Sequence, residues 1–294
     1  MPYGFPSGRG LLEMVLQELG DRGSRLPRIC GSNGCPTKLA GFAEALRYCG
    51  RGSVDALLEY REDLVQIGKI AIAEVLGRCE KRDLLFTPAG GQGDWYHYLC
   101  GRMSSPFDEF GSNPLGVITF NYDRSLEEFL FTALKHSYER PDKKCAEQVS
   151  HLRIVHVHGS LGCLPWQGPG GRGYGDFVED HHVVDAAKSI KIIHEATDEG
   201  EAFAEAWKLI AEAERIVMLG FGYAQANVRR LRLRGIQGKA ELHGSCFGLS
   251  EMERLSALNE LHAGLDQSRQ HRVRIDGLNS WDCLGFIRNA GWIE

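Results

Sequence analysis

Two short runs of β-branched residues end abruptly in polar residues and glycine. Residues 116–123 read Gly-Val-Ile-Thr-Phe-Asn-Tyr-Asp, and residues 153–162 read Arg-Ile-Val-His-Val-His-Gly-Ser-Leu-Gly. A buried parallel strand that delivers catalytic groups at its carboxyl end has this pattern. The first run offers Asn121 and Asp123 and the second offers His158, so an amide, a carboxylate and an imidazole could meet in one crevice. The pattern indicates a site for chemistry.

Each of these side chains also has a structural alternative. Asn121 and Asp123 precede a predicted helix, where either could act as the N-cap. The imidazole of His158 can accept a proton near neutral pH, which suits a general base, and Gly159 would let a ligand approach the backbone. His156 shares a strand face with His158. Because no third metal ligand is evident nearby, a core or supporting position is expected for His156.

A second glycine turn follows a later predicted strand. Gly220-Phe221-Gly222-Tyr223 precedes a predicted helix, and Gln225 stands where a dinucleotide-binding fingerprint would have its third glycine. Backbone N–H groups of such a strand–turn–helix can bind phosphate or ribose oxygens. Because the third glycine is missing, an ordinary structural turn is the alternative.

The segment Thr119-Phe120-Asn121-Tyr122-Asp123, followed by His158-Gly159-Ser160-Leu161-Gly162, resembles the sirtuin-like, NAD-consuming family. The similarity is to the prokaryotic-type branch of NAD hydrolases and sensors rather than to the protein deacylases. It covers nearly the whole chain, because further segments fit the family in the same order: 53–58, 67–73, 94–96, 164–166, 219–223 and Asn227.

The resemblance implies a role for each matching residue. The Asn121 amide would position the nicotinamide ribose and the attacking water, Asp123 would hydrogen-bond the nicotinamide carboxamide or support the amide, and His158 would be the general base. Further contacts to NAD are expected along the same two segments and at the glycine turn, which would meet the adenosine half: Thr119, Phe120, Tyr122, Gly159, Gly220, Phe221, Gly222 and Asn227.

The function that the resemblance implies is an NAD glycohydrolase, which cleaves NAD into nicotinamide and ADP-ribose without a metal. Such domains serve in antiphage defence and are triggered by a protein partner or by homo-oligomer formation. The alternative is a non-catalytic sensor of NAD or an ADP-ribose-type nucleotide, which need not keep His158. A deacylase usually carries a zinc module of two close cysteine pairs, whereas Cys30 and Cys35 have no second such pair.

The start of the chain departs from the family pattern. Family members open with a strand and a glycine-rich loop that wraps the NAD pyrophosphate at a helix N-terminus. Here Pro2-Tyr3-Gly4-Phe5-Pro6-Ser7-Gly8 looks like the segment just after that loop. Either the start is placed too late or the loop is lost, and in both cases we expect weak NAD binding and slow turnover.

The composition is ordinary for a globular protein, with 43% hydrophobic and 25% charged residues. A formal net charge of −5 disfavours a nucleic-acid partner, because nucleic-acid binders usually carry a basic excess. The sequence has no apolar run of the roughly 18 residues that span a bilayer, and residues 1–10 lack the apolar region of a secretory signal. A cytoplasmic protein without a membrane partner is expected, with its nine cysteines as reduced thiols.

Apolar spacing predicts a helical first part and then alternating strands and helices. This alternation is typical of an α/β fold with a Rossmann-like, doubly wound parallel sheet. We expect a single domain over 1–294 with an inserted helical subdomain over 36–112. Helices are predicted at 11–19, 39–48, 54–64, 65–79, 95–103, 125–134, 203–214, 250–262 and 281–290, and strands at 117–120, 154–157, 216–219, 241–248 and 273–275.

Three further expectations concern loops and aromatic residues. The glycine-rich stretch 165–175 is expected to be a mobile lid. His181 and His182 are expected in a solvated, charged loop. Some aromatic residues could either stack on the rings of NAD or pack in the core, namely Trp95, Tyr96 and Trp166.

Overall fold

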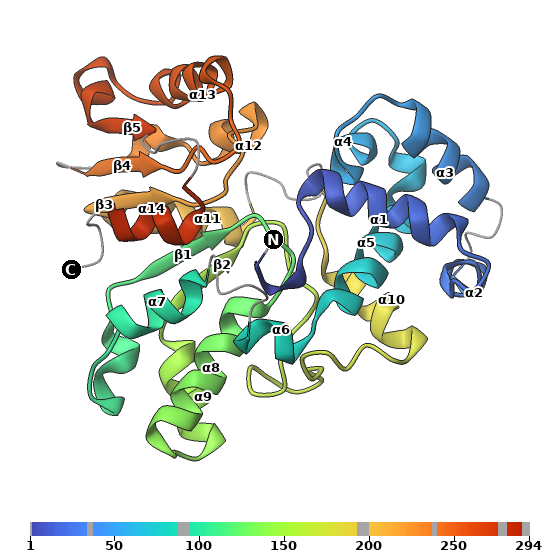
Figure 1. Ribbon diagram of the computed structural model, residues 1–294, viewed down its shortest axis with the longest axis horizontal. Helices are drawn as coiled ribbons and strands as arrows, with labels where there is room; N and C mark the ends of the chain where they lie inside the picture. The colour runs from blue at the N-terminus through green and yellow to red at the C-terminus, as the bar shows by residue number, and fades with distance from the viewer. Residues whose placement is uncertain are drawn as a thin grey trace. The chain divides into compact units, whose positions relative to one another are not determined.

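The computed structural model describes residues 2–33, 38–87, 94–192, 200–236, 240–275 and 281–289. The chain divides into two compact units. The first comprises residues 1–89 and 105–197, and the second comprises residues 90–104 and 198–294. Each unit combines helices with parallel strands (Figure 1), so the expected mixed α/β class is confirmed.

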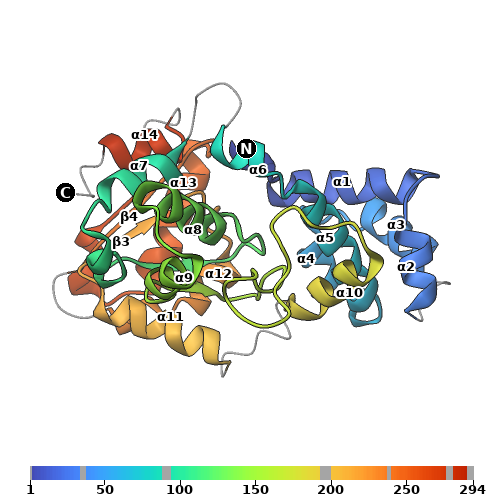
Figure 2. The ribbon, with the colours of Figure 1, turned by 90° about the horizontal axis from the view of Figure 1, so that it is seen from below.

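The first unit contains a group of helices built around α5 (Val65–Cys79). This helix is buried along most of its length, as its run of isoleucine, alanine and valine requires, and it packs against α1, α2, α4 and α10 (Figure 2). Its buried Glu74 accepts two hydrogen bonds of 2.9 Å from Nε of Arg25. The other helices of this group are α1 (Gly8–Gly20), α2 (Leu26–Ser32), α3 (Leu39–Tyr48), α4 (Val54–Leu58), α6 (Arg82–Phe86) and α10 (Asp180–Ser189).

The same unit contains the two strands whose ends carry the predicted catalytic residues. Strand β1 (Gly116–Thr119) pairs in parallel with β2 (Arg153–His156). Helix α8 (Ser125–Tyr138) follows β1 and packs against α9 (Asp142–Ser150). As its spacing predicts, α8 buries one apolar face, made of Leu126, Phe129 and Leu130.

The second unit contains a three-stranded parallel sheet in the order β3-β4-β5. Helix α13 packs against β5 and α12, and α14 packs against α7. Ser250 and Glu253 form a capping box at the start of α13, which explains why this helix begins where it does. The elements are β3 (Arg215–Met218), β4 (Glu241–Gly244), β5 (Val273–Ile275), α7 (Trp95–Arg102), α11 (Glu201–Glu212), α12 (Gln225–Arg230), α13 (Glu251–Ala263) and α14 (Cys283–Asn289).

The structure corrects several details of the predicted fold. Within the described residues the strands form two short sheets, and a Rossmann-like doubly wound sheet stays a prediction. The helix predicted over 54–64 is interrupted after Leu58 and resumes as a 3-10 helix, Glu62–Leu64. His181 and His182 lie in the first turn of α10 rather than in a loop.

The predicted domain organisation stays a prediction. Helices expected in the subdomain over 36–112 occur in both units: α3 to α6 belong to the first and α7 to the second. Among the described residues, no helix is both long enough and apolar enough to cross a membrane.

Candidate functional site

The ends of β1 and β2 bring part of the predicted site together. Thr119 pairs with His156 in the parallel register, and the Val157 N–H donates to the Thr119 carbonyl at 3.1 Å. The residues after both strands therefore leave the same edge of the sheet. The Phe120 and His158 rings meet edge to face there, with 5.5 Å between centroids.

Asn121 lies at this edge with an exposed side chain and a fixed backbone. Its N–H donates to the Thr119 hydroxyl oxygen at 3.1 Å, and its carbonyl accepts from Nδ1 of His156 at 3.0 Å. The hydroxyl of Thr119 is therefore bonded to the protein's own backbone. These two bonds hold the backbone of Asn121 from two sides, and the exposed side-chain amide extends from this fixed backbone.

His156 links Asn121 to a buried carboxylate. Its Nε2 lies 2.7 Å from Oε1 of Glu127, whose side chain is only 7% exposed. The partners of both ring nitrogens, a carbonyl and a carboxylate, are acceptors, so the arrangement favours the doubly protonated imidazolium. Burial opposes that charge, but the charge and hydrogen bond of Glu127 and the Asn121 carbonyl outweigh it and raise the pKa of His156. His156 is therefore a positioning residue, as expected.

The raised pKa of His156 gives folding stability a pH dependence. This contribution is fully present below the unfolded pKa, about 6.5, and is lost as pH rises through the higher folded pKa. We expect the free energy of unfolding, measured by urea denaturation, to fall over that interval and His156→Gln to remove this part of the fall. His136→Gln, at an exposed position of the same helix as Glu127, is the control. An unchanged pH profile in His156→Gln would contradict the assignment.

Asp123 acts as a local cap, the alternative left open by its sequence position. Its Oδ1 accepts from the Ser125 N–H at 3.2 Å and from the Ser125 hydroxyl. Burial raises the pKa of Asp123, although the hydrogen bonds from Ser125 oppose this increase. The carboxylate therefore stabilises the first turn of α8, and its predicted contact with nicotinamide stays a prediction.

Tyr122 anchors the residues after β1 to the helical group. Its side chain is buried, and its hydroxyl donates to Oδ1 of Asp55 in α4 at 2.6 Å. Its carbonyl accepts from the Leu161 N–H at 2.9 Å. The phenol hydroxyl is thus engaged inside the protein, and a contact of Tyr122 with NAD stays a prediction.

His158 is buried, with 5% of its surface exposed. Its carbonyl accepts from the Lys191 N–H at 2.8 Å. At Gly159 (φ +72°), a Cβ atom would lie 2.0 Å from the carbonyl oxygen of Ser189. The protein's own backbone therefore makes a close approach at Gly159, and a contact of Gly159 with NAD stays a prediction.

Gly159→Ala is expected to destabilise the protein. A non-glycine residue in a left-handed conformation costs about 1–3 kcal/mol, and overlap with the Ser189 carbonyl adds to that cost. Gly162→Ala is the matched control, because Gly162 also has a positive φ (+90°) but has no atom within 4 Å of its Cβ position. Chemical denaturation should show a larger loss of unfolding free energy for Gly159→Ala, and equal losses would contradict the contact.

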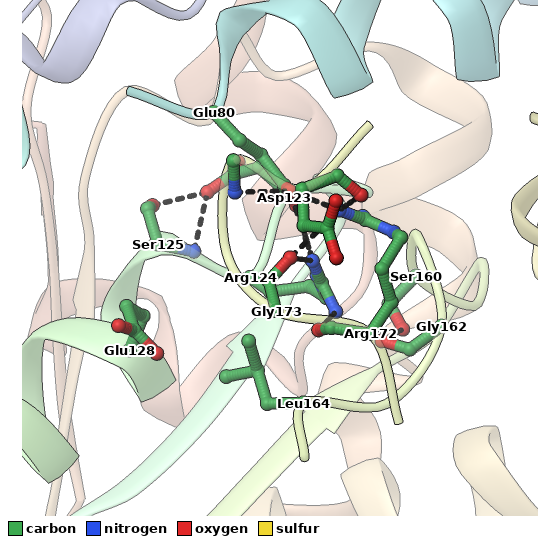
Figure 3. A network of polar contacts seen from close by, with 12 residues as sticks. Glu80, Asp123, Arg124, Ser125, Glu128, Ser160, Gly162, Leu164, Arg172 and Gly173 are labelled. Atoms are coloured by element: carbon green, nitrogen blue, oxygen red, sulfur yellow. Dashed lines mark hydrogen bonds and ion pairs between the residues drawn. The ribbon is translucent and has the colours of Figure 1, made fainter. Parts of the chain in front are cut away.

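A buried cluster of charges underlies the strand ends (Figure 3). The side chain of Arg124 is 1% exposed and that of Glu80 is fully buried. Nε and Nη2 of Arg124 donate to the two carboxylate oxygens of Glu80, both at 2.9 Å. Its Nη1 donates to the carbonyls of Cys163 at 2.9 Å and Arg172 at 3.0 Å. Because these polar groups satisfy one another, the cluster can remain charged without water.

The charge cluster fixes the glycine-rich stretch 165–175. Nη1 of Arg172 donates to Oε2 of Glu80 at 2.7 Å, and the N–H of Gly175 donates to the same oxygen at 3.1 Å. Tyr174 is buried within the stretch. These bonds attach the end of the stretch to the core of the first unit, and a mobile lid stays a prediction.

The glycine turn, residues 220–223, belongs to the second unit, and hydrogen bonds to Ser245 hold it in place. The Gly220 N–H donates to Oγ of Ser245 at 2.9 Å, and the Tyr223 hydroxyl donates to the Ser245 carbonyl at 2.9 Å. A Cβ on Gly244 would lie 1.8 Å from the Tyr223 hydroxyl oxygen, so β4 needs glycine there. At Gly220 the contacts favour the structural-turn alternative.

The other predicted contacts of this turn stay predictions. Phe221 is half-buried and meets Tyr223 edge to face, with 5.6 Å between ring centroids. Gly222 is exposed, and Asn227 is half-buried in α12. The predicted NAD site thus comprises two groups of residues, one in each unit.

The aromatic residues outside the strand ends pack on other rings. Trp166 stacks on Phe131 with 5.0 Å between ring centroids, and Trp95 meets Tyr96 edge to face at 4.5 Å. The core-packing alternative therefore holds for these contacts. Cys30 is buried, and Cys35 lies outside the described residues. In the described part of the chain, no group of three or more His, Cys, Asp or Glu side chains could hold a metal ion, and a metal-free site stays a prediction.

Comparison with known proteins gives no family assignment. No protein-family model matches the chain, and neither the curated proteins nor the solved structures contain a significant match. The sirtuin-like resemblance therefore rests on the sequence segments alone.

Proposed function

We propose that this protein is an NAD glycohydrolase whose catalytic residues follow β1 and β2. The main support is the fixed and exposed position of Asn121, whose backbone is held by Thr119 and by the His156–Glu127 pair. An amide side chain carried by a fixed backbone at the carboxyl end of parallel strands can orient a ribose and a water molecule with little backbone reorganisation, which favours catalysis. The second support is the sequence resemblance to NAD-consuming proteins.

In the proposed reaction, water adds to C1′ of the nicotinamide ribose as the bond from C1′ to the nicotinamide nitrogen breaks. The electron pair of that bond stays on the ring nitrogen, and the departing nicotinamide is neutral. The transition state has oxocarbenium character at the ribose. Asn121 orients the ribose and the water, Asp123 stabilises the turn that carries the amide, and His158 accepts the proton lost by the water.

A second candidate function is a sensor that binds NAD or an ADP-ribose-type nucleotide without cleaving it. The observation that favours the sensor is the burial of His158, which has only 5% of its surface exposed and lies against the Phe120 ring. A general base has to reach its proton directly or through one water. The glycohydrolase therefore requires His158 to become accessible when NAD binds, whereas the sensor does not.

One experiment separates the two functions. The purified protein is incubated with NAD, binding is measured by calorimetry, and nicotinamide and ADP-ribose are quantified by chromatography. The glycohydrolase predicts equal amounts of the two products, whereas the sensor predicts binding without product. Neither binding nor product would contradict both. The same proposal includes a protein partner or self-association as the trigger of NAD hydrolysis.

A further inference from the structure

A pocket of about 730 Å³ lies in the first unit between α8, α9, β2 and the loop that carries Trp166. Its volume is within the range of small-molecule sites, roughly 300–1,000 Å³. The predicted catalytic residues do not line it. It adjoins their support, because Glu127 lines the pocket and also binds His156. The pocket has a polar base, an aromatic wall and a basic rim.

The polar base is the carboxylate of Glu127. Oε1 contacts Nε2 of His156 at 2.7 Å. Among the described residues, no donor is hydrogen-bonded to Oε2 of this largely buried side chain. This oxygen belongs to a residue that lines the pocket, and a ligand N–H group there can donate a charge-assisted hydrogen bond to it. The base of the pocket therefore selects a ligand with a hydrogen-bond donor.

The wall is flat and apolar. Trp166 lines the pocket, and its indole is held by stacking on Phe131 with an interplanar angle of 7°. Val149 and Ile154 complete the apolar surface. An immobilised indole favours a planar ring, because stacking on it then costs little conformational entropy.

The rim carries two lysines near the start of α9. Lys144 forms an ion pair with Glu147 at 2.9 Å. Lys143 is exposed and has no ion pair among the described residues. An unpaired ammonium beside a second lysine is suited to a phosphate group.

We propose that this pocket binds a nucleotide whose base carries an exocyclic amino group. The base lies along Trp166, its amino group donates to Glu127, and its phosphate contacts Lys143. This second site uses none of Asn121, Asp123 or His158, and it shares only Glu127 with the residues that support Asn121.

The proposal is tested by isothermal titration of the full chain with AMP, IMP and inorganic phosphate. IMP lacks the exocyclic amine, and losing a hydrogen bond to a charged group lowers affinity about tenfold or more. AMP should therefore bind at least about tenfold more tightly than IMP, and phosphate alone more weakly still. Equal affinity for AMP and IMP, or no binding of AMP, would overturn the proposal.

Variants locate the binding in this pocket. Lys143→Ala and Trp166→Leu should each weaken AMP binding by about tenfold, since an anion contact and base stacking have effects of this size. Lys188→Ala, at an exposed lysine of α10 that is paired with Asp185, is the control and should bind AMP like the wild type. Unchanged AMP affinity in Lys143→Ala or in Trp166→Leu would overturn the assignment.

Discussion

Replacing Asn121 with Ala is expected to lower the rate of nicotinamide release from NAD by about 10²–10³-fold, the usual effect of removing one preorganised polar group that acts in the transition state. The amide is exposed, and the bonds that hold its residue come from backbone atoms. The substitution therefore leaves the Thr119 and His156 contacts in place. The loss should appear in kcat, measured by chromatography of nicotinamide.

The controls for Asn121→Ala address stability and position. Its melting temperature should stay within a few degrees of the wild type, because an exposed side chain contributes little to folding. Thr119→Val removes the hydroxyl that accepts from the Asn121 N–H and should give a smaller loss of rate, because the amide is kept but less firmly held. A folded Asn121→Ala with the wild-type rate would contradict a catalytic role for the amide.

Replacing Arg124 with Met is expected to lower the free energy of unfolding by about 3–5 kcal/mol, the usual effect of breaking a buried ion pair. The change removes both hydrogen bonds from Arg124 to the buried Glu80 carboxylate. Among the described residues, Arg172 is then the one remaining cation paired with Glu80. It also removes the donor to the Cys163 carbonyl. Denaturation with urea measures the loss.

The matched control is an arginine that is paired at the surface. Arg28 is 69% exposed and lies 2.8 Å from Asp180, so Arg28→Met should cost less than about 1 kcal/mol. If Arg124→Met and Arg28→Met lost similar amounts of unfolding free energy, burial would not determine how much these ion pairs stabilise the protein. Faster proteolysis within 165–175 in Arg124→Met would further show that the charge cluster fixes this stretch.

Long elements with strong apolar periodicity could be predicted from the sequence. Helices α3 and α5 and strand β5 have the predicted bounds, because each repeats apolar residues at the spacing of its own structure. Helices α2, α6, α9 and α10 were not predicted. Helix α10 shows why: its Val183 and Ala186 are buried, and it packs against α5, which is distant in the sequence. Such short helices depend on tertiary contacts.

The candidate site was partly predictable for a related reason. Two apolar strands that end in polar residues could be recognised from the sequence, and the structure pairs them in parallel with Thr119 opposite His156. The partners of those residues are distant in sequence. Arg124 meets Glu80 across 44 positions, and His156 meets Glu127 across 29. Acidic residues usually face solvent, so no sequence pattern indicates that these carboxylates are buried.

The most direct test of the proposed function is the rate of nicotinamide release from NAD. It is measured side by side for the wild type, Asn121→Ala and His158→Ala, with Lys188→Ala as the unaffected control. We predict slow but measurable hydrolysis by the wild type and by Lys188→Ala, with equal amounts of ADP-ribose and nicotinamide. The Asn121 and His158 variants should lose about 10²-fold or more while remaining folded. Equal nicotinamide release by all four proteins, or none from the wild type, would contradict catalysis by residues at the ends of β1 and β2.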